Sequence, residues 1–165
     1  MIVIGIDPGI SNTGFGIVET RGGQSLAHDG GVIVTHNETP LELRLAAIST
    51  RVGELIDRYR PDAMAIESIY FGKNAETAFL VGQARGAILA EAGARDLPVA
   101  SYTPQQIKLA VCGAGGAGKE QVQRMVTALL GLEGPLPPDH AADALAVGIC
   151  HANAAPMAAA VGAAS

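Results

Sequence analysis

The sequence predicts an α/β protein: a mixed five-stranded sheet, with three antiparallel strands followed by two parallel ones, flanked by helices on both faces. β-Branched segments bounded by turn residues fill the first 35 residues, and helical periodicity then alternates with two further strand-like segments. The 165 residues have room for one such domain, which we assign to residues 1–153. The Ala-rich segment 154–165 is predicted to be a disordered tail.

Three strands are expected first. Residues 1–7 are rich in β-branched side chains and stop at the turn signal Asp7-Pro8-Gly9. Asn12-Thr13-Gly14 is predicted to form a second turn, with strands at 15–20 and 31–35. Consecutive strands joined in this way predict an antiparallel meander.

Helices then alternate with two strands. Apolar residues at spacings of three and four predict an amphipathic helix over 41–59, and residues 63–67 are typical of a buried parallel strand. A helix is expected from about Asn74 to about residue 94, followed by a strand at 97–102. With the helix that follows this strand, the predicted order of elements is βββαβαβα, and more helices come after it.

Further helices are expected after the last strand. Thr103-Pro104-Gln105-Gln106 combines a capping Thr, a first-turn Pro and a Gln three residues after the cap, and predicts a helix that runs to about Cys112. The glycine-rich segment 113–118 interrupts it, and an amphipathic helix follows to about Leu130. A last helix is predicted to begin near Asp139, after a proline-rich break.

The bulk composition limits the possible classes of function. The net charge of -5 counts mildly against a nucleic-acid partner, although carboxylates gathered to bind metal would themselves lower it. No apolar run reaches the ~20 residues of a membrane span, and the N-terminus lacks the pattern of a secretory signal, so we expect a cytoplasmic protein. The two cysteines have neither disulfide nor zinc-site spacing.

Acidic residues occur where a shared site is expected. Asp7 and Glu67 each end a predicted strand, and the ends of neighbouring strands in an α/β sheet meet at one edge. His140 and Asp143 are three residues apart and therefore lie on one face of the last helix. Asp7 alone could be a turn residue and His140 alone a surface residue, but a carboxylate inside an Ala-rich helix, as at Asp143, favours a function.

This set of side chains is typical of phosphodiester hydrolysis. Two divalent ions ~4 Å apart can activate water and stabilise the leaving oxygen, and carboxylates are the ligands that Mg²⁺ or Mn²⁺ prefers. Imidazole suits Mn²⁺ better than Mg²⁺, and His140 could instead transfer a proton. The neighbouring Asp139 is a good helix cap, yet it also lies on the face of Asp143 and remains an alternative ligand.

The sequence resembles the RuvC family of Holliday-junction resolvases from Ile4 to about His151. The resemblance rests on Gly-Ile-Asp-Pro-Gly at 5–9 with Thr13-Gly14, Ala-Ile-Glu-Ser at 65–68 with Lys-Asn-Ala at 73–75, Gly-Gln-Ala-Arg-Gly at 82–86, Gln-Gln-Ile-Lys at 105–108, Gly-Lys-Glu-Gln-Val at 118–122 and Ala-Ala-Asp-Ala-Leu-Ala at 141–146. It implies a ribonuclease H-like fold and a homodimer. It also implies symmetric nicking of four-way DNA junctions in recombination and repair, and cooperation with the RuvA–RuvB branch-migration complex.

The resemblance also implies roles for individual residues. Asp7, Glu67 and Asp143 match three catalytic carboxylates, and His140 stands where many relatives have Asp. For Tyr70 and Phe71 the resemblance implies stacking on bases at the junction centre. For Lys108 and Lys119 it implies contacts near the scissile phosphate. Weaker phosphate contacts are implied for Lys73, Arg85 and Arg124. Core packing for the aromatic residues and a solvated surface for the lysines are the alternatives.

Three other functions deserve comparison. Asp7-Pro8-Gly9 with Thr13-Gly14 also satisfies the phosphate loop of actin-like and sugar-kinase ATPases, but those enzymes need two lobes and this chain has room for one. Residues 113–119 nearly form a Walker A loop, yet Glu120 stands where Ser or Thr would bind Mg²⁺. A module that binds junctions without cutting them would not need three carboxylates that repel one another.

Overall fold

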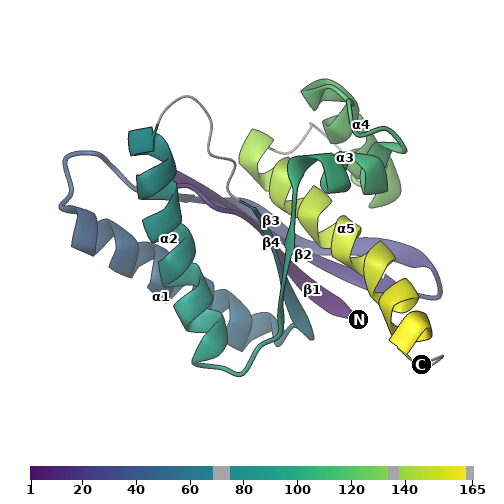
Figure 1. Ribbon diagram of the computed structural model, residues 1–165, viewed down its shortest axis with the longest axis horizontal. Coiled ribbons are helices and arrows are strands. Elements are labelled where there is room, and N and C mark those ends of the chain that lie inside the picture. The colour runs from purple at the N-terminus through teal and green to yellow at the C-terminus, as the bar shows by residue number, and fades with distance from the viewer. Residues whose placement is uncertain (69–74, 134–137, 163–165) are drawn as a thin grey trace.

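The computed structural model describes residues 1–68, 75–133 and 138–162, with side chains up to residue 154 (Figure 1). Five strands form one sheet in the order β3-β2-β1-β4-β5, in which β1, β2 and β3 are antiparallel and β4 and β5 run parallel to β1. This confirms the predicted fold class. The strands are β1 (Ile2–Asp7), β2 (Asn12–Arg21), β3 (Gln24–Val34), β4 (Ala63–Glu67) and β5 (Val99–Tyr102).

Helices cover both faces of the sheet. The first two pack on one face, and the last three pack on the other, with α5 lying along β1 and β2 (Figure 1). They are α1 (Leu41–Tyr59), α2 (Ala75–Gly93), α3 (Pro104–Cys112), α4 (Lys119–Leu129) and α5 (Asp139–Gly162). The helix α5 extends into the Ala-rich segment, and disorder beyond residue 153 stays a prediction. Within the described ranges, no helix is long and apolar enough to cross a membrane.

The hairpin of β2 and β3 is longer than predicted. The segment 12–14, predicted to be a turn, begins β2, and β3 begins at Gln24 instead of at Gly31. A two-residue turn joins the strands at Gly22-Gly23, where both glycines have positive φ (57° and 82°). Polar residues hid the start of β3, because one face of this edge strand is open to solvent and its alternating pattern needs few apolar side chains.

Short sequence patterns predicted the helices correctly. The predicted bounds of α1 are confirmed, and α3 begins with the expected capping box. The Thr103 hydroxyl accepts a hydrogen bond from the backbone N–H of Gln106 at 3.2 Å, and the Gln106 side chain accepts one from the N–H of Thr103 at 2.8 Å. The segment 113–118 connects α3 to α4, so it does not follow a strand as a Walker A loop would.

Alternation along the central strands directs the candidate ligands to one face. In β1, Ile4 and Ile6 pack against α1 and α2, whereas Val3 packs on the α5 side. The period of two therefore turns Asp7 toward α5. In β4, Ala65 packs on the α5 side, and Glu67 faces the same way.

Glycines let α5 approach the sheet closely. A Cβ atom added at Gly5 would lie 2.1 Å from the carbonyl oxygen of Ala144, and one at Gly14 would lie 1.9 Å from that of His140. Real contacts of this kind do not fall below about 3.0 Å. Because any side chain at these positions would collide with the helix backbone, the glycines determine how close α5 lies to β1 and β2.

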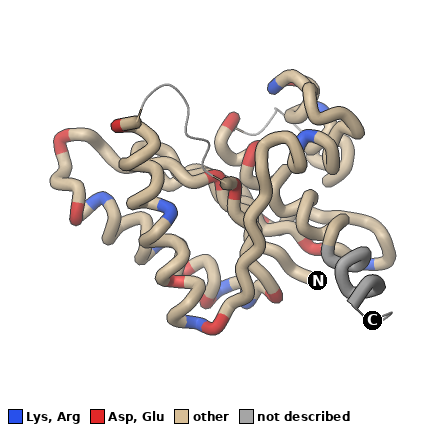
Figure 2. The backbone as a smooth tube through the Cα atoms, in the orientation of Figure 1, with Lys and Arg blue, Asp and Glu red and all other residues tan. Residues whose placement is uncertain are grey.

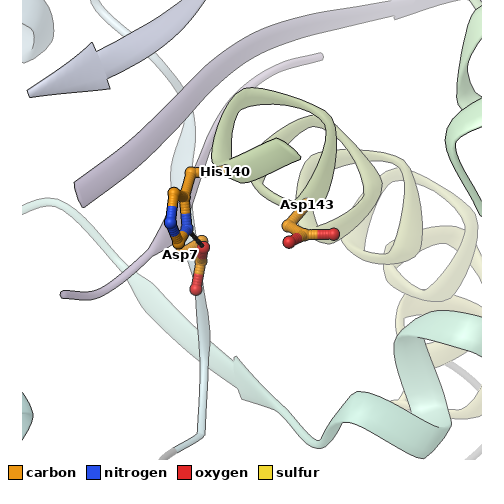
Figure 3. Close-up of side chains that lie close together, drawn as sticks. All are labelled: Asp7, His140 and Asp143. Atoms are coloured by element: carbon orange, nitrogen blue, oxygen red, sulfur yellow. Dashed lines mark hydrogen bonds and ion pairs between the residues drawn. The ribbon is translucent and has the colours of Figure 1, made fainter. Parts of the chain in front are cut away.

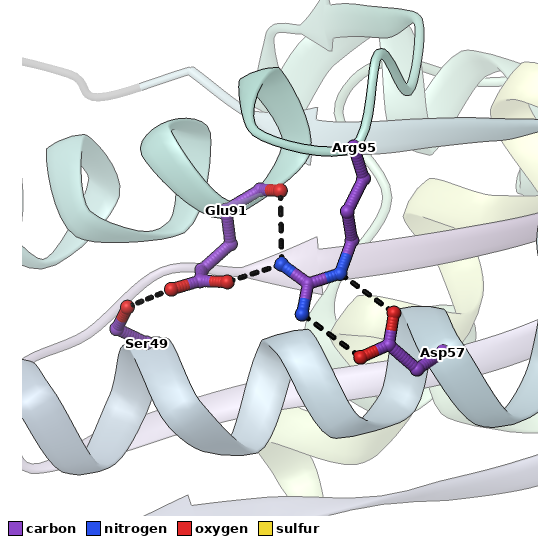
Figure 4. A network of polar contacts seen from close by, with 4 residues as sticks. All are labelled: Ser49, Asp57, Glu91 and Arg95. Atoms are coloured by element: carbon purple, nitrogen blue, oxygen red, sulfur yellow. Dashed lines mark hydrogen bonds and ion pairs between the residues drawn. The ribbon is translucent and has the colours of Figure 1, made fainter.

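A polar network joins α1 and α2 on the opposite face (Figure 4). Arg95 donates to both carboxylate oxygens of Asp57, at 2.7 and 2.9 Å, and also to the Glu91 carboxylate. Ser49 donates to the other oxygen of Glu91. These contacts link side chains of α1 to the C-terminal end of α2 and to Arg95, which follows it.

Candidate functional site

The candidate site lies at the edge of the sheet where β1 and β4 end and α5 begins. Asp7 is the last residue of β1 and Glu67 the last of β4, and these parallel strands are neighbours. In the ladder between β1 and β2, Asp7 is paired with Gly14, the residue on which the first turn of α5 packs. The register therefore places Asp7 directly beside the start of α5.

The first turns of α5 supply the other two predicted ligands. The Nδ1 atom of His140 and the Oδ2 atom of Asp7 are 2.8 Å apart, and Asp143 faces them from the next turn (Figure 3). Asp7, His140 and Asp143 each offer a ligand atom within 4.8 Å of the others. Glu67 lies just outside this group, close enough for its carboxyl group to interact with that of Asp7. The four predicted ligands thus converge from three distant segments.

The carboxyl groups of the site are partly buried and lie close to one another. Burial raises the pKa of Asp7, although the hydrogen bond and charge of His140 oppose this. Burial, together with the charges of Asp7 and Asp143, raises the pKa of Glu67 to about 7. Burial and the charge of Asp7 also raise the pKa of Asp143. All three carboxyl groups are therefore less stable as anions here than in water.

These residues fit a divalent cation. Oxygen ligands with one imidazole are suitable for Mg²⁺ or Mn²⁺, and a cation would relieve the repulsion that raises the carboxyl pKa values. Asp139, the alternative ligand, does not belong to the three-residue ligand group. Its carboxylate instead contacts Lys119 at 2.9 Å and accepts a hydrogen bond from Gln123 at 2.6 Å.

A pocket of about 280 Å³ adjoins the carboxylates. Glu67, Asp143, Lys108 and Lys119 line it together with apolar residues of α3, α4 and α5. Figure 2 shows acidic positions gathered where the central strands meet the start of α5, with basic positions on the neighbouring helices. Two of the predicted phosphate-binding lysines thus lie beside the site.

The other predicted DNA contacts are placed differently. Arg85 of α2 donates to the Ser101 hydroxyl of β5 at 2.8 Å, while its Nε atom is buried without a hydrogen-bond partner in the described structure. Arg124 of α4 lies against Glu120 on the surface. Tyr70, Phe71 and Lys73 lie outside the described residues.

The sequence interpretation missed one determinant of the site. The sequence pattern predicts a turn at Gly14, but this residue lies in β2, where the absence of a side chain lets the backbone of α5 at His140 come close. The available signal was glycine at alternate positions, Gly14 and Gly16, which is unfavourable in a strand unless another backbone approaches closely.

Comparison with known proteins extends this picture. The family model described as crossover junction endodeoxyribonuclease RuvC matches residues 3–151. The chain is 54% identical over 157 residues to the RuvC protein of Moorella thermoacetica, covering 94% of this chain and 93% of the relative. It is 48% identical over 151 residues to that of Syntrophomonas wolfei, covering 92% and 88%.

Comparison with solved structures finds the same family as comparison of sequences. Thermus thermophilus RuvC in complex with Holliday junction substrate superposes with a TM-score of 0.92 at 42% identity, covering 96% of each chain. The yeast mitochondrial Holliday junction resolvase Ydc2 shares the fold, with a TM-score of 0.63 at 16% identity. The protein therefore belongs to the RuvC family of crossover junction endodeoxyribonucleases.

Proposed function

We propose that this protein resolves four-way DNA junctions by divalent-metal-dependent hydrolysis, with Asp7, Glu67, His140 and Asp143 as metal ligands. The observation that carries the proposal is the convergence of these residues at one edge of the sheet. Membership of the RuvC family and the close match to a relative solved with Holliday junction substrate indicate the DNA substrate.

The protein side chains have separable tasks. Asp7, Glu67 and Asp143 supply the negative charge that binds Mg²⁺ or Mn²⁺, in a site suited to two ions. Bound ions would activate the attacking water and stabilise the leaving oxygen. His140 is the fourth ligand and is held by its contact with Asp7. Because one ligand is an imidazole, we expect Mn²⁺ to be an effective ion.

The DNA backbone would lie over the pocket beside these ligands. Lys108 and Lys119 border the pocket, where each can contact a phosphate near the scissile bond. Lys73 and Arg85 would make weaker phosphate contacts, and Tyr70 with Phe71 would stack on bases opened at the junction centre.

The proposed assembly is a homodimer that acts in the cytoplasm with the RuvA–RuvB branch-migration complex. A four-way junction has two strands of like polarity to cut, so two copies of the site related by a two-fold axis suit symmetric nicking. Family membership supports this part of the proposal.

One assay tests the function. A mobile four-way junction and a matched linear duplex are each incubated with Mg²⁺, Mn²⁺ or chelator. We expect metal-dependent cutting of the junction alone, and Asp7→Asn should abolish cutting while junction binding persists. Glu54→Gln serves as the control, because Glu54 is an exposed carboxylate of α1 that pairs with Arg51. Equal cutting of duplex and junction would contradict the proposal.

A further inference from the structure

Lys119 occupies a position that helix stability does not explain. It is the first residue of α4, after the cap residue Gly118, which provides no side-chain hydrogen bond. A cation at a helix N-terminus is disfavoured, because the helix dipole places partial positive charge there. A compensating anion is therefore expected near Lys119.

Asp139 provides this anion from the first turn of α5. Its Oδ2 atom lies 2.9 Å from the Lys119 Nζ atom, and its Oδ1 atom accepts a hydrogen bond from Gln123 at 2.6 Å. Gln123 is 9% exposed, so the second contact fixes the Asp139 side chain against α4. Contact with Asp139 raises the pKa of Lys119, and contact with Lys119 lowers that of Asp139.

The other anions that act on Lys119 are proposed metal ligands. The charges of Asp143 and Asp7 also raise the pKa of Lys119, and Lys119 lines the same pocket as Asp143. If Asp139 did not hold the ammonium group, these two carboxylates would be its available partners. The Lys119 ammonium group would then lie between these carboxylates, at the position proposed for a divalent ion.

We propose that Asp139 is a positioning residue, which keeps the Lys119 ammonium at the rim of the pocket and away from the metal-binding carboxylates. The inference rests on the proposed metal site. Both partners are about half exposed (54% and 59%), so the ion pair is weak enough for an arriving DNA phosphate to replace Asp139. Because Asp139 holds Lys119 in this place, the lysine is available to contact a DNA phosphate and does not lower the affinity of the carboxylates for metal.

A double-mutant cycle tests this coupling in the full chain. The variants are Asp139→Asn, Lys119→Met and the two combined. Two quantities are measured: the Mn²⁺ concentration for half-maximal thermal stabilisation without DNA, and that for half-maximal single-turnover junction cleavage. Because an exposed ion pair is weak, we expect Asp139→Asn to raise both midpoints only moderately, roughly three- to fivefold. In the Lys119→Met background it should change neither.

Glu120→Gln is the matched control. It removes one negative charge next to Lys119, but the Glu120 carboxylate is largely exposed and pairs with Arg124. We expect both midpoints to stay at their wild-type values. A similar rise in this variant would show that general charge, and not Asp139, controls the affinity for metal.

Other results would overturn the inference. Unchanged midpoints in Asp139→Asn would do so, as would an equal rise with and without Lys119, which would indicate an independent effect on α5. Absence of junction cleavage by the wild-type protein would contradict the proposed function instead. The thermal measurement without DNA would still decide the role of Asp139 in that case.

Discussion

Replacing Gly14 with Ala should disable the site by moving α5. The new Cβ atom would lie 1.9 Å from the His140 carbonyl oxygen, 2.6 Å from its carbonyl carbon and 3.2 Å from its Cβ atom. An ordinary contact begins at 3.4 Å, so the backbone of α5 must retreat by about 1.5 Å. The nearest atoms are backbone, and a rotamer change cannot relieve the collision.

Both stability and catalysis should fall in this variant. Overpacking of this kind costs about 1 to 3 kcal/mol of unfolding free energy. Displacement of His140 and Asp143 from Asp7 by ~1 Å is expected to lower the cleavage rate roughly a hundredfold, because catalysis depends steeply on geometry. The loss of rate should therefore persist well below the melting temperature of the variant.

The assay is single-turnover cleavage of a four-way junction with saturating Mn²⁺, measured alongside thermal unfolding. Gly30→Ala is the control, because a Cβ there would lie 3.4 Å from the Leu145 side chain, an ordinary contact. It should retain both rate and stability. A folded Gly14→Ala protein that cleaves within threefold of the wild-type rate would refute the role assigned to the glycine.

Three further predictions concern charge, metal and packing. The raised pKa of Glu67 means that the metal-free folded state binds more protons than the unfolded chain between pH 4.5 and about 7, so its stability falls as the pH rises through this range. Glu67→Gln should therefore be more stable than wild type by roughly 3 kcal/mol at pH 8, and equally stable at pH 4, in chemical denaturation with chelator. Equal stability at both pH values would contradict this. Mn²⁺ should raise the melting temperature more at pH 8 than at pH 6, where it must displace a proton from Glu67, and a larger rise at pH 6 would count against Glu67 as a ligand. Leu55→Ala, in the fully buried face of α1, should cost about 2 to 5 kcal/mol in denaturant unfolding while leaving the cleavage rate at 25 °C unchanged; a loss below 1 kcal/mol would show that this core can repack.

Local chemistry explains why much of the fold could be predicted. β-Branched runs such as residues 2–4 and complete caps such as Thr103 with Gln106 act within a few residues, so sequence reveals them directly. The hairpin of β2 and β3 was placed too short because its pairing depends on a partner strand and one solvent-facing side. A two-glycine turn was the missed signal.

The convergence of the proposed ligands could be predicted for a similar reason. Strand ends and helix faces follow from periodicity, which is enough to place Asp7 and Glu67 at one edge of the sheet and His140 and Asp143 on one helix face. The partner of Asp139 could not be predicted in this way. Its contact with Lys119 joins the first turns of two separate helices and arises from tertiary packing alone.

The separation of the proposed ligands along the chain has a consequence for biosynthesis. Asp7 belongs to the first strand made, whereas His140, which contacts it, is 133 residues later and reaches it only when α5 packs on β1 and β2. During translation the proposed site therefore lacks two of its four residues until α5 has been made. A nascent or prematurely terminated chain without α5 is therefore expected to be harmless to DNA, and nuclease activity should begin only when synthesis of the domain is nearly complete.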